Sequence, residues 1–397
     1  GMRNLISNKV IRIAFASAPI LVLVLLALPA VYGQTFTVLH TFAGGIDGGT
    51  PLATPVLYNG SVYGTASAGG AHNNGAVYQY DVTPRTENTV HSFAGAPDGA
   101  DPVAGLVQDS ANNFYGVTYR GGAHGCGTAF KLTPAGVFSL LHSFTGPTAQ
   151  GCGPAGTLIF DPLGNLFGTT YSGGSTAGYG TVFEILANLT YKTGQSFPPA
   201  GAVPRGGLHL QGGKLYGTTT GGGAGLSGGT IFEVTGTTPL YTFTGGTDGA
   251  EPAGSLVGDG GNNLYGTTSA GGTGTFGLGS GVVFQYNTST QKESVLHTFS
   301  GSDGATPVAG LVRDSHGNLY GTTTLGGASG YGTVFKLDTS LNLTTVYSFT
   351  GQGDGGKPYA GVIVDSAGNI WGATSIGGSV SAPGGYGTLF IIAPPPS

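Results

Sequence analysis

Apolar and polar residues alternate in short segments that are separated by glycine-rich turns, and this pattern recurs along the chain. One unit contains four segments rich in β-forming residues: Ser294–Phe299, Gly310–Asp314, Leu319–Thr323 and Thr333–Leu337. A tight turn joins the second segment to the third, and a glycine-rich loop joins the third to the fourth. No segment shows a 3.6-residue apolar period over helical length. The pattern therefore predicts four short antiparallel strands in each unit.

A Tyr-Gly-Thr-Thr-like string marks the third segment of every unit. It begins at Tyr63, Tyr115, Phe167, Tyr216, Tyr265, Tyr320 and Trp371. The spacings are 52, 52, 49, 49, 55 and 51 residues, so the repeat is about 51 residues long. Four strands in a repeat of roughly this length are typical of a β-propeller blade. We predict an all-β fold, a seven-bladed β-propeller with four-stranded blades.

The two ends of the repeat region complement each other. The region begins with a lone segment of the outer-strand type, about residues 36–42, and it ends after an inner segment, Thr388–Ile392. The last blade therefore lacks the strand that the N-terminus has in excess. A linear solenoid would need capping repeats instead, and we find none. We expect the N-terminal strand to close the ring as the outer strand of the last blade.

The first 33 residues have the features of a signal peptide. Arg3, Lys9 and Arg12 precede an uncharged stretch at 13–30, and small residues precede a cleavage site after Gly33. An uncleaved anchor is the alternative, because this stretch is near the lower limit for a membrane span. Two prolines within the stretch favour cleavage. The expected organisation is a signal peptide at 1–33, a propeller at 34–392 and a Pro-rich tail at 393–397.

Composition and charge narrow the class of partner. The chain has 79 glycines among 397 residues, with 13 basic and 18 acidic side chains. This charge is too low for charge-driven disorder, and the glycines lack the collagen period. Beyond residue 33 the net charge is −8, which makes nucleic acid a poor partner. No second apolar run of membrane length follows. We expect an exported monomer, extracellular, at the cell surface or in the periplasm, with no membrane span after signal removal.

The recurring strings also resemble a known family. They are His-[Ser/Thr]-Phe, Asp-Gly-Ala-x-Pro, Gly-Asn-Leu-Tyr-Gly-Thr-Thr and Gly-Gly-x-x-Gly-Tyr-Gly-Thr-Val-Phe. Over residues 36–392 the chain resembles the Gloeo/Verruco (GloVer) tandem-repeat family of bacterial extracellular proteins. The resemblance implies an exported, secreted or surface-held protein and implies no particular activity. Many members of the family add a C-terminal sorting anchor, which the Pro-rich tail of this chain does not resemble.

Two sets of loops share one face of the predicted ring, which we call the rim face. They are the Asp-Gly loops that enter each blade and the glycine-rich loops between its second and third strands. Regularly placed candidates for ligand binding are Asp47, Asp98, Asp303, Asp354, Tyr179, Tyr331 and Tyr386. Candidates that break the repeat are His72, Arg120 and His124.

Each regular candidate has a structural interpretation beside the functional one. An Asp in such a loop can accept hydrogen bonds from its own turn. Clustered carboxylates can also bind Ca²⁺, but a ring places equivalent residues too far apart to share one ion, so we expect no metal and no other cofactor. A second acidic set recurs in the hairpins of the opposite face and is predicted to stabilise turns: Asp109, Asp161, Asp259, Asp314 and Asp365.

Histidine recurs at one outer-strand position, in His40, His91, His142 and His297, where we expect hydrogen bonds within the blade. His209 lies on an innermost segment and is our candidate for a side chain facing the central channel. The alternative is a structural histidine with satisfied hydrogen bonds.

The two cysteines break the repeat within one unit. Cys126 replaces the Tyr of a glycine-rich loop, and Cys152 replaces a residue two places before a loop proline. The repeat register makes these loops neighbours on the rim face. An exported protein meets an oxidising compartment, so we predict a Cys126–Cys152 disulfide.

Catalytic motifs are absent from the sequence. There is no Glu pair, His/Glu cluster or Cys-x-x-Cys, and the glycine strings within 223–229 lack the strand-to-helix context of a nucleotide or nucleophile motif. We predict a non-catalytic binding or scaffold module whose ligand is a glycan or a protein. One alternative is an extracellular lyase or hydrolase that acts at the channel mouth with residues such as His209 or His124. Another is a structural surface or matrix component. Convergence of non-repeated polar residues at one channel mouth would favour a site there.

Overall fold

The computed structural model describes residues 33–146, 150–174, 178–198, 201–222, 228–236, 238–272, 279–378 and 384–395. The predicted signal sequence up to residue 32, and residues 223–227 of the glycine strings, lie outside this part of the chain. In the described residues no helix is long and apolar enough to cross a membrane. The proposed signal peptide and its cleavage stay predictions.

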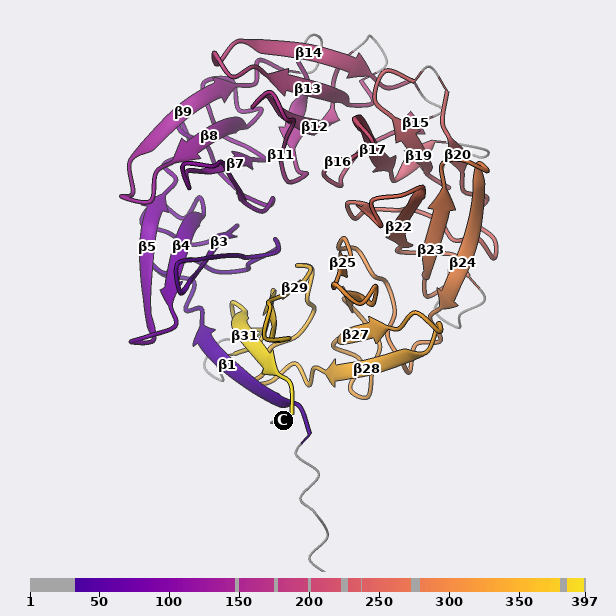
Figure 1. The fold of residues 1–397 in the computed structure, drawn as a ribbon. Helices are drawn as coiled ribbons and strands as arrows, with labels where there is room; N and C mark the ends of the chain where they lie inside the picture. Colours follow the sequence, from indigo (N-terminus) through magenta and orange to yellow (C-terminus); the bar gives the residue numbers. More distant parts are fainter. Residues whose placement is uncertain are drawn as a thin grey trace, which may run out of the picture.

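Seven small antiparallel sheets stand around a central axis, as predicted, and form a seven-bladed β-propeller (Figure 1). The strands of blade 1 are β2 (Val56–Tyr58), β3 (Ser61–Ala66), β4 (Ala76–Asp81) and β5 (Thr86–Ser92). Blade 2 has β6 (Val107–Gln108), β7 (Phe114–Thr118), β8 (Thr128–Leu132) and β9 (Phe138–Ser143). Blade 3 has β10 (Cys152–Pro154), β11 (Ile159–Phe160), β12 (Leu166–Ser172), β13 (Thr181–Ile185) and β14 (Tyr191–Ser196).

The later blades repeat this order. Blade 4 has β15 (Gly201–Ala202), β16 (His209–Gln211), β17 (Lys214–Thr219), β18 (Gly221–Gly222), β19 (Thr230–Glu233) and β20 (Tyr241–Thr242). Blade 5 has β21 (Val257–Gly258), β22 (Asn263–Thr268), β23 (Val282–Asn287) and β24 (Lys292–Thr298). Blade 6 has β25 (Val312–Arg313), β26 (Leu319–Thr323), β27 (Thr333–Leu337) and β28 (Leu343–Ser348). Blade 7 has β29 (Ile363–Val364), β30 (Ile370–Thr374), β31 (Thr388–Ala393) and β1 (Thr35–Thr41).

The first strand of the described chain belongs to the last blade. Strand β1 pairs antiparallel with β31, from Thr35 opposite Ala393 to Thr41 opposite Thr388. A register shift lies between Val38 and His40. In Figure 1 the indigo strand β1 lies outside the yellow strand β31, so the ends of the repeat region share one sheet.

The core lies between neighbouring blades and consists of aromatic pairs. The Phe that directly follows each outer strand packs edge-to-face on the third-strand aromatic of the next blade, with ring centroids 4.7 to 5.3 Å apart. The seven pairs are Phe42–Tyr78, Phe93–Phe130, Phe144–Phe183, Phe197–Phe232, Phe243–Phe284, Phe299–Phe335 and Phe349–Phe390. Each blade thus buries its apolar surface only against its neighbours, which is why the ring has to close.

The glycine of the Tyr-Gly-Thr-Thr string makes room for this core. A Cβ atom at Gly321 would lie 2.6 Å from Cζ of Phe335 on the adjacent strand of the same blade. The same close approach recurs at Gly168 with Phe183 and at Gly266 with Phe284. The string recurs because the third-strand aromatic ring lies flat against the second strand at this position.

Candidate functional site

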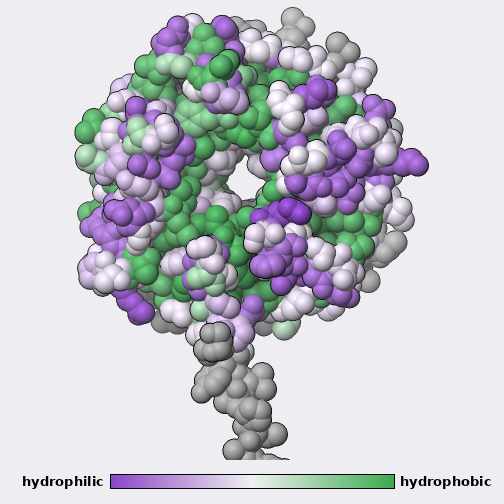
Figure 2. Space-filling model, in the orientation of Figure 1, coloured by the Kyte–Doolittle hydropathy of each residue, from purple (hydrophilic) through white to green (hydrophobic). Residues whose placement is uncertain are grey.

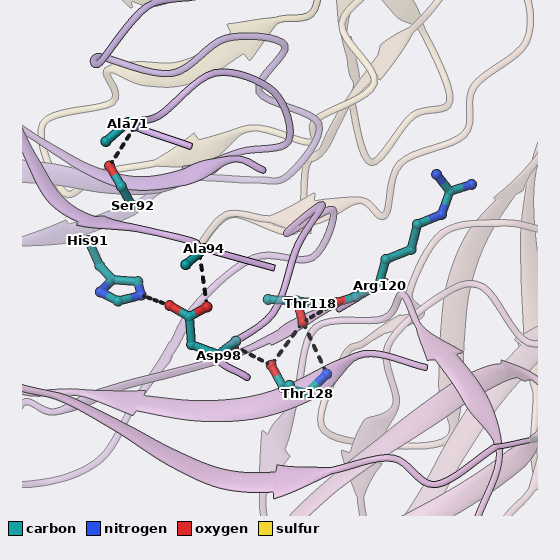
Figure 3. Close-up of polar contacts among 8 residues, drawn as sticks. All are labelled: Ala71, His91, Ser92, Ala94, Asp98, Thr118, Arg120 and Thr128. Carbon is teal, nitrogen blue, oxygen red and sulfur yellow. Dashed lines mark hydrogen bonds and ion pairs between the residues drawn. The ribbon is translucent and has the colours of Figure 1, made fainter. Parts of the chain in front are cut away.

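The rim aspartates form hydrogen bonds within their own loops and with the outer strand that precedes each loop. His91 Nε2 lies 3.0 Å from Asp98 Oδ2, and the Ala94 N–H donates to Asp98 Oδ1 at 2.9 Å (Figure 3). Equivalent contacts join His40 to Asp47, Tyr241 to Asp248, His297 to Asp303 and Tyr347 to Asp354. These carboxylates therefore have structural partners, the alternative that the sequence left open for Asp47, Asp98, Asp303 and Asp354.

The outer-strand histidines that face a rim aspartate donate to it from Nε2. Burial lowers the pKa of His40, His91 and His142, although the partner side chain opposes this shift in each case. A carboxylate accepts only, so the proton of His91 lies on Nε2, facing Asp98. For Asp303 burial raises the pKa, but hydrogen bonds from Ser300 and His297 outweigh it and hold the pKa below its usual value.

In five of the blades a pair of buried threonines ties the rim loop to the strands beneath it. Thr118 Oγ1 lies 2.8 Å from Thr128 Oγ1, and Thr128 Oγ1 donates to the backbone oxygen of Asp98 at 3.0 Å (Figure 3). Thr118 Oγ1 also donates to the Arg120 backbone oxygen, while the Arg120 side chain extends away from this network. Matching pairs are Thr170–Thr181, Thr219–Thr230, Thr323–Thr333 and Thr374–Thr388.

The aspartates of the opposite face stabilise their hairpins. Asp109 accepts hydrogen bonds from the Ala111 N–H, from the N–H and Nδ2 of Asn113 and from Tyr115 Oη, all at 2.8 to 2.9 Å. Burial raises the pKa of Asp109, but these bonds outweigh it and hold the pKa below its usual value. These contacts support the turn role predicted for this acidic set.

Two of the rim tyrosines pack across the boundary between blades. Tyr331 covers Gly351 of blade 7's entry loop, where an added Cβ would lie 2.5 Å from the ring. Tyr386 covers Gly44 of blade 1 in the same way. Their exposed fractions of 37% and 39% reflect these edge positions. Tyr179 is half-buried and packs against the core between blades 3 and 4.

The predicted disulfide is present between Cys126 and Cys152. Cys126 occupies the loop position that Tyr331 and Tyr386 hold in other blades, and Cys152 occupies that of Gly356 and Gly49. A covalent bond therefore replaces the packing of a tyrosine on a glycine.

The remaining predicted site residues do not meet in one place. His72 and His124 are exposed at the tips of separate loops. Arg120 forms an ion pair with Asp101 at 3.5 Å. His209 on β16 lies against blade 5, where a Cβ at Gly258 would be 2.6 Å from its Nε2. Burial lowers the pKa of His209, while a hydrogen bond with Gln211 opposes the shift.

A cavity of about 780 Å³ opens where the entry loops surround the central channel. The ring has a visible central opening (Figure 2). The cavity is lined largely by residues just before and just after the loop prolines, at positions that differ from blade to blade. The aromatic and charged side chains of its lining are Tyr171, Arg205, Glu251, Lys357 and Tyr359.

The backbone at this mouth is the same in every blade. The residue before each loop proline has a left-handed φ: Thr50 54°, Asp101 53°, Gly153 68°, Val203 63°, Glu251 56°, Thr306 56° and Lys357 50°. This conformation is unfavourable for residues other than glycine. It is held from both sides: Lys357 N donates to Tyr331 O of the preceding blade at 2.8 Å, and Ser375 Oγ donates to Lys357 O at 2.8 Å. At this position the backbone conformation is therefore the same in every blade, while the side chain differs from blade to blade.

An arc of aromatic and cationic side chains runs from blade 2 to blade 4 at the mouth. The guanidinium of Arg205 lies over the Tyr171 ring, 5.3 Å from its centroid. Tyr119 meets Tyr171 edge-to-face at 6.0 Å. Where Tyr119 and Tyr171 stand, other blades have small hydroxyl residues such as Ser67 and Ser269 that cap the neighbouring carbonyl. Both tyrosines are thus departures from the repeat.

We did not predict the mouth residues from the sequence. The signal available there was variation: Arg205 and Tyr359 follow loop prolines where the other repeats have Leu, Val or Ala. The candidates chosen from the sequence were mostly residues that recur from blade to blade. Regular recurrence in a repeat indicates a structural role, so the variable positions were the better guide to a binding site.

The model of the Gloeobacter/Verrucomicrobia repeat family matches residues 29–232 and 227–397. The chain belongs to this family. No curated protein matches its sequence. Among solved structures it is similar to a gluconolactonase, XC5397 from Xanthomonas campestris, with 11% identity, 91% of this chain and 90% of that chain covered, and a TM-score of 0.47.

Two other solved structures compare in the same way with this Gloeobacter/Verrucomicrobia repeat protein. A luciferin-regenerating enzyme is 12% identical, with 91% and 95% of the two chains covered and a TM-score of 0.47. A putative oxidoreductase (glucose dehydrogenase) from Thermus thermophilus is 14% identical, with 91% and 100% covered and a TM-score of 0.47. At these identities the similarity concerns the fold alone.

Metal ligands do not cluster in the described part of this repeat protein. No group of three or more His, Cys, Asp or Glu side chains among those residues is placed to hold a metal ion. The rim carboxylates are instead distributed one to a loop and hydrogen bonded there.

Two half-buried glutamates give this repeat protein a pH-dependent contact between blades. Glu87 and Glu293 occupy the outer-strand position at which Phe138 stacks on His91 and Tyr191 on His142. Burial raises the pKa of both glutamates to about 7, and the rim aspartate of the loop that enters the same blade, Asp47 or Asp248, adds to the rise.

We expect the double variant Glu87→Gln, Glu293→Gln to gain thermal stability over the wild type as the pH rises. In the unfolded chain these carboxyl groups ionise near their ordinary pKa of 4.5, and in the folded protein only near 7. Their contribution to stability is therefore lost as the pH rises from 4.5 to 7. The difference in Tm between variant and wild type should be small at pH 4.5, grow up to pH 7 and then level off. The control is Glu184→Gln, which removes a surface acid paired with Lys192; a pH-independent difference for the double variant would contradict this expectation.

Proposed function

We propose that this protein is an exported, non-catalytic propeller that binds a glycan at the channel mouth on its rim face. The observation that carries the proposal is the cavity of about 780 Å³ lined by non-repeated side chains on a repeat-invariant backbone. Its volume lies within the range of small-ligand sites, roughly 300–1,000 Å³. A concave site of this size fits one or a few sugar rings better than the flat surface of a protein partner.

The chemistry of the lining supports a carbohydrate ligand. Tyr171 is half-buried and Tyr359 is 44% exposed, so both offer ring faces to the apolar side of a sugar. Arg205 and Glu251 are exposed and offer a hydrogen-bond donor and an acceptor. Because the threonine pairs and entry loops fix the backbone beneath them, little order has to be gained on binding.

An array of glycans tests this function. The full chain should bind a subset of the array, and Tyr171→Ala or Tyr359→Ala should weaken that binding about tenfold, as expected for a central aromatic contact. The variants Tyr171→Phe and Tyr359→Phe keep the rings and should retain binding. Absence of glycan binding, or binding that survives both alanine changes, would refute the proposal.

An extracellular lyase or hydrolase is the second candidate, because Glu251 shares the cavity with Arg205 and Lys357. Glycoside hydrolysis commonly uses two carboxylates, and among the described lining residues Glu251 is the single acid. Incubation of the bound glycans with the protein, followed by chromatography, separates the two functions. Unchanged glycans support a binding module; products that disappear in Glu251→Gln would establish an enzyme.

A further inference from the structure

The channel-mouth cavity holds two cationic side chains, Arg205 and Lys357, that form no ion pair with an acidic side chain in the described part of the chain. The ion pairs found among the described residues join other groups: Arg120 to Asp101, Lys192 to Glu184 and Lys214 to Glu233, besides three His–Asp pairs. Neither Arg205 nor Lys357 takes part in one of these pairs. Glu251, in the same cavity, is also unpaired in the described structure. The cavity thus carries a net positive charge in a protein whose formal net charge is −5.

The contacts of Arg205 and Lys357 restrict where their charged groups can lie. Arg205 follows Pro204 in blade 4 and lies over the Tyr171 ring of blade 3, which limits the positions its guanidinium can take. Lys357 precedes Pro358 in blade 7 and has its backbone fixed at both ends by hydrogen bonds. The two side chains therefore approach the cavity from separate blades. A ligand between them would meet positive charge from two sides.

Glu251 adds a negative charge to one part of the cavity, so the charge of the cavity is unevenly distributed. It comes from blade 5, next to the blade of Arg205, and its backbone N–H donates to Gly228 O at 2.9 Å. A carboxylate accepts hydrogen bonds from sugar hydroxyls and repels another anion. A ligand that has both hydroxyls and acidic groups would place its acids near Arg205 or Lys357 and its hydroxyls near Glu251. The planar guanidinium suits a planar carboxylate through paired N–H···O bonds.

We infer that the ligand of the channel mouth is an acidic glycan whose sugar carries a carboxylate, such as a uronic acid residue. This inference rests on the proposed function and specifies its ligand class. Tyr171 and Tyr359 would contact sugar rings, Arg205 and Lys357 would each bind a carboxylate from its own blade, and Glu251 would accept from hydroxyls.

The test compares acidic glycans with their neutral counterparts. The full chain is applied to an array that holds uronate- and sialate-containing oligosaccharides, the methyl esters of the same compounds, and neutral and sulfated glycans. We expect the acidic members to be bound and their esters to bind at least about tenfold more weakly, the loss typical of a charge-assisted hydrogen bond. Binding should also weaken with added salt.

Variants that change a charge in the cavity test whether the affinity for the acidic probe changes in the expected direction. Arg205→Gln and Lys357→Gln should each weaken binding of the acidic probe about tenfold, while Glu251→Gln, which removes a repelling negative charge and keeps an amide oxygen as acceptor, should tighten it. Lys292→Gln on β24 is the control, since it removes the same charge from an exposed outer-strand position. Equal binding of acids and esters, preference for sulfated or neutral glycans, or insensitivity to both cation variants would overturn the inference and leave the proposed function standing. Failure to bind any glycan would overturn both.

Discussion

Replacing both cysteines by serine is expected to lower the free energy of unfolding by about 3 kcal/mol, the stabilisation typical of a loop of this length. Cys126 and Cys152 are 26 residues apart and join blade 2 to the entry loop of blade 3. The serines would leave a gap at a position where other blades have a packed tyrosine. The measurement is the denaturant midpoint of the Cys126→Ser, Cys152→Ser variant under non-reducing conditions.

The repeat itself supplies the matched variant. Cys126→Tyr with Cys152→Gly recreates the arrangement in which Tyr331 lies on Gly351 and Gly356. Because this arrangement holds other blades together without a covalent bond, the variant should lose less stability than the double serine. If the double serine unfolded at the same denaturant concentration as the wild type, the disulfide would contribute nothing. If the tyrosine variant were the less stable of the two, the two devices would not be equivalent.

Gly254→Ala is expected to destabilise the protein by about 3 kcal/mol, at the upper end of the usual effect of overpacking. A Cβ at this position would lie 2.4 Å from the carbonyl carbon of Ala309 and 2.5 Å from the nitrogen of Gly310. These are backbone atoms of the next blade, so no change of rotamer relieves the clash and the blades must move apart. The Gly254 oxygen also accepts a hydrogen bond from Thr218 at 3.1 Å, which this movement would strain.

The control for this prediction is another glycine-to-alanine change. Gly353 has no atom within 4 Å of an added Cβ, and its φ lies outside the left-handed region. Gly353→Ala should therefore leave stability unchanged or raise it slightly by restricting the unfolded chain. Thermal unfolding of both variants decides the matter, and equal melting temperatures would show that blades 5 and 6 can separate without loss.

The sequence repeats alone would give the wrong expectation for Gly254. Four other blades have alanine at the equivalent position: Ala53, Ala104, Ala309 and Ala360. By that comparison alanine is the common residue and its introduction looks harmless. The closeness of blades 5 and 6 reverses the expectation, because the distance between blades near the axis is not the same all around the ring.

The architecture could be predicted because the sequence pattern of one blade recurs seven times along the chain. The blade strands, the glycine beneath Phe335 and the Phe of each outer strand serve one packing problem that every blade shares. A turn residue such as Asp109 is read from its own neighbours, since all its partners lie within six residues. The Cys126–Cys152 disulfide was predictable for a related reason: both residues depart from one register, and the register says which loops are adjacent.

The candidate site was decided by tertiary structure. Tyr171, Arg205, Glu251 and Tyr359 stand in four different blades and up to 188 positions apart in the sequence, and closure of the ring alone brings them around one cavity. His209 depends on the tertiary structure too, since its side chain lies against Gly258 of the next blade. Local hydrogen bonding and packing repeat with the sequence, so the sequence by itself determined the blades, their turns and their closure. Convergence at the axis depends on where each variable side chain is carried by the ring, and only the folded molecule decided that.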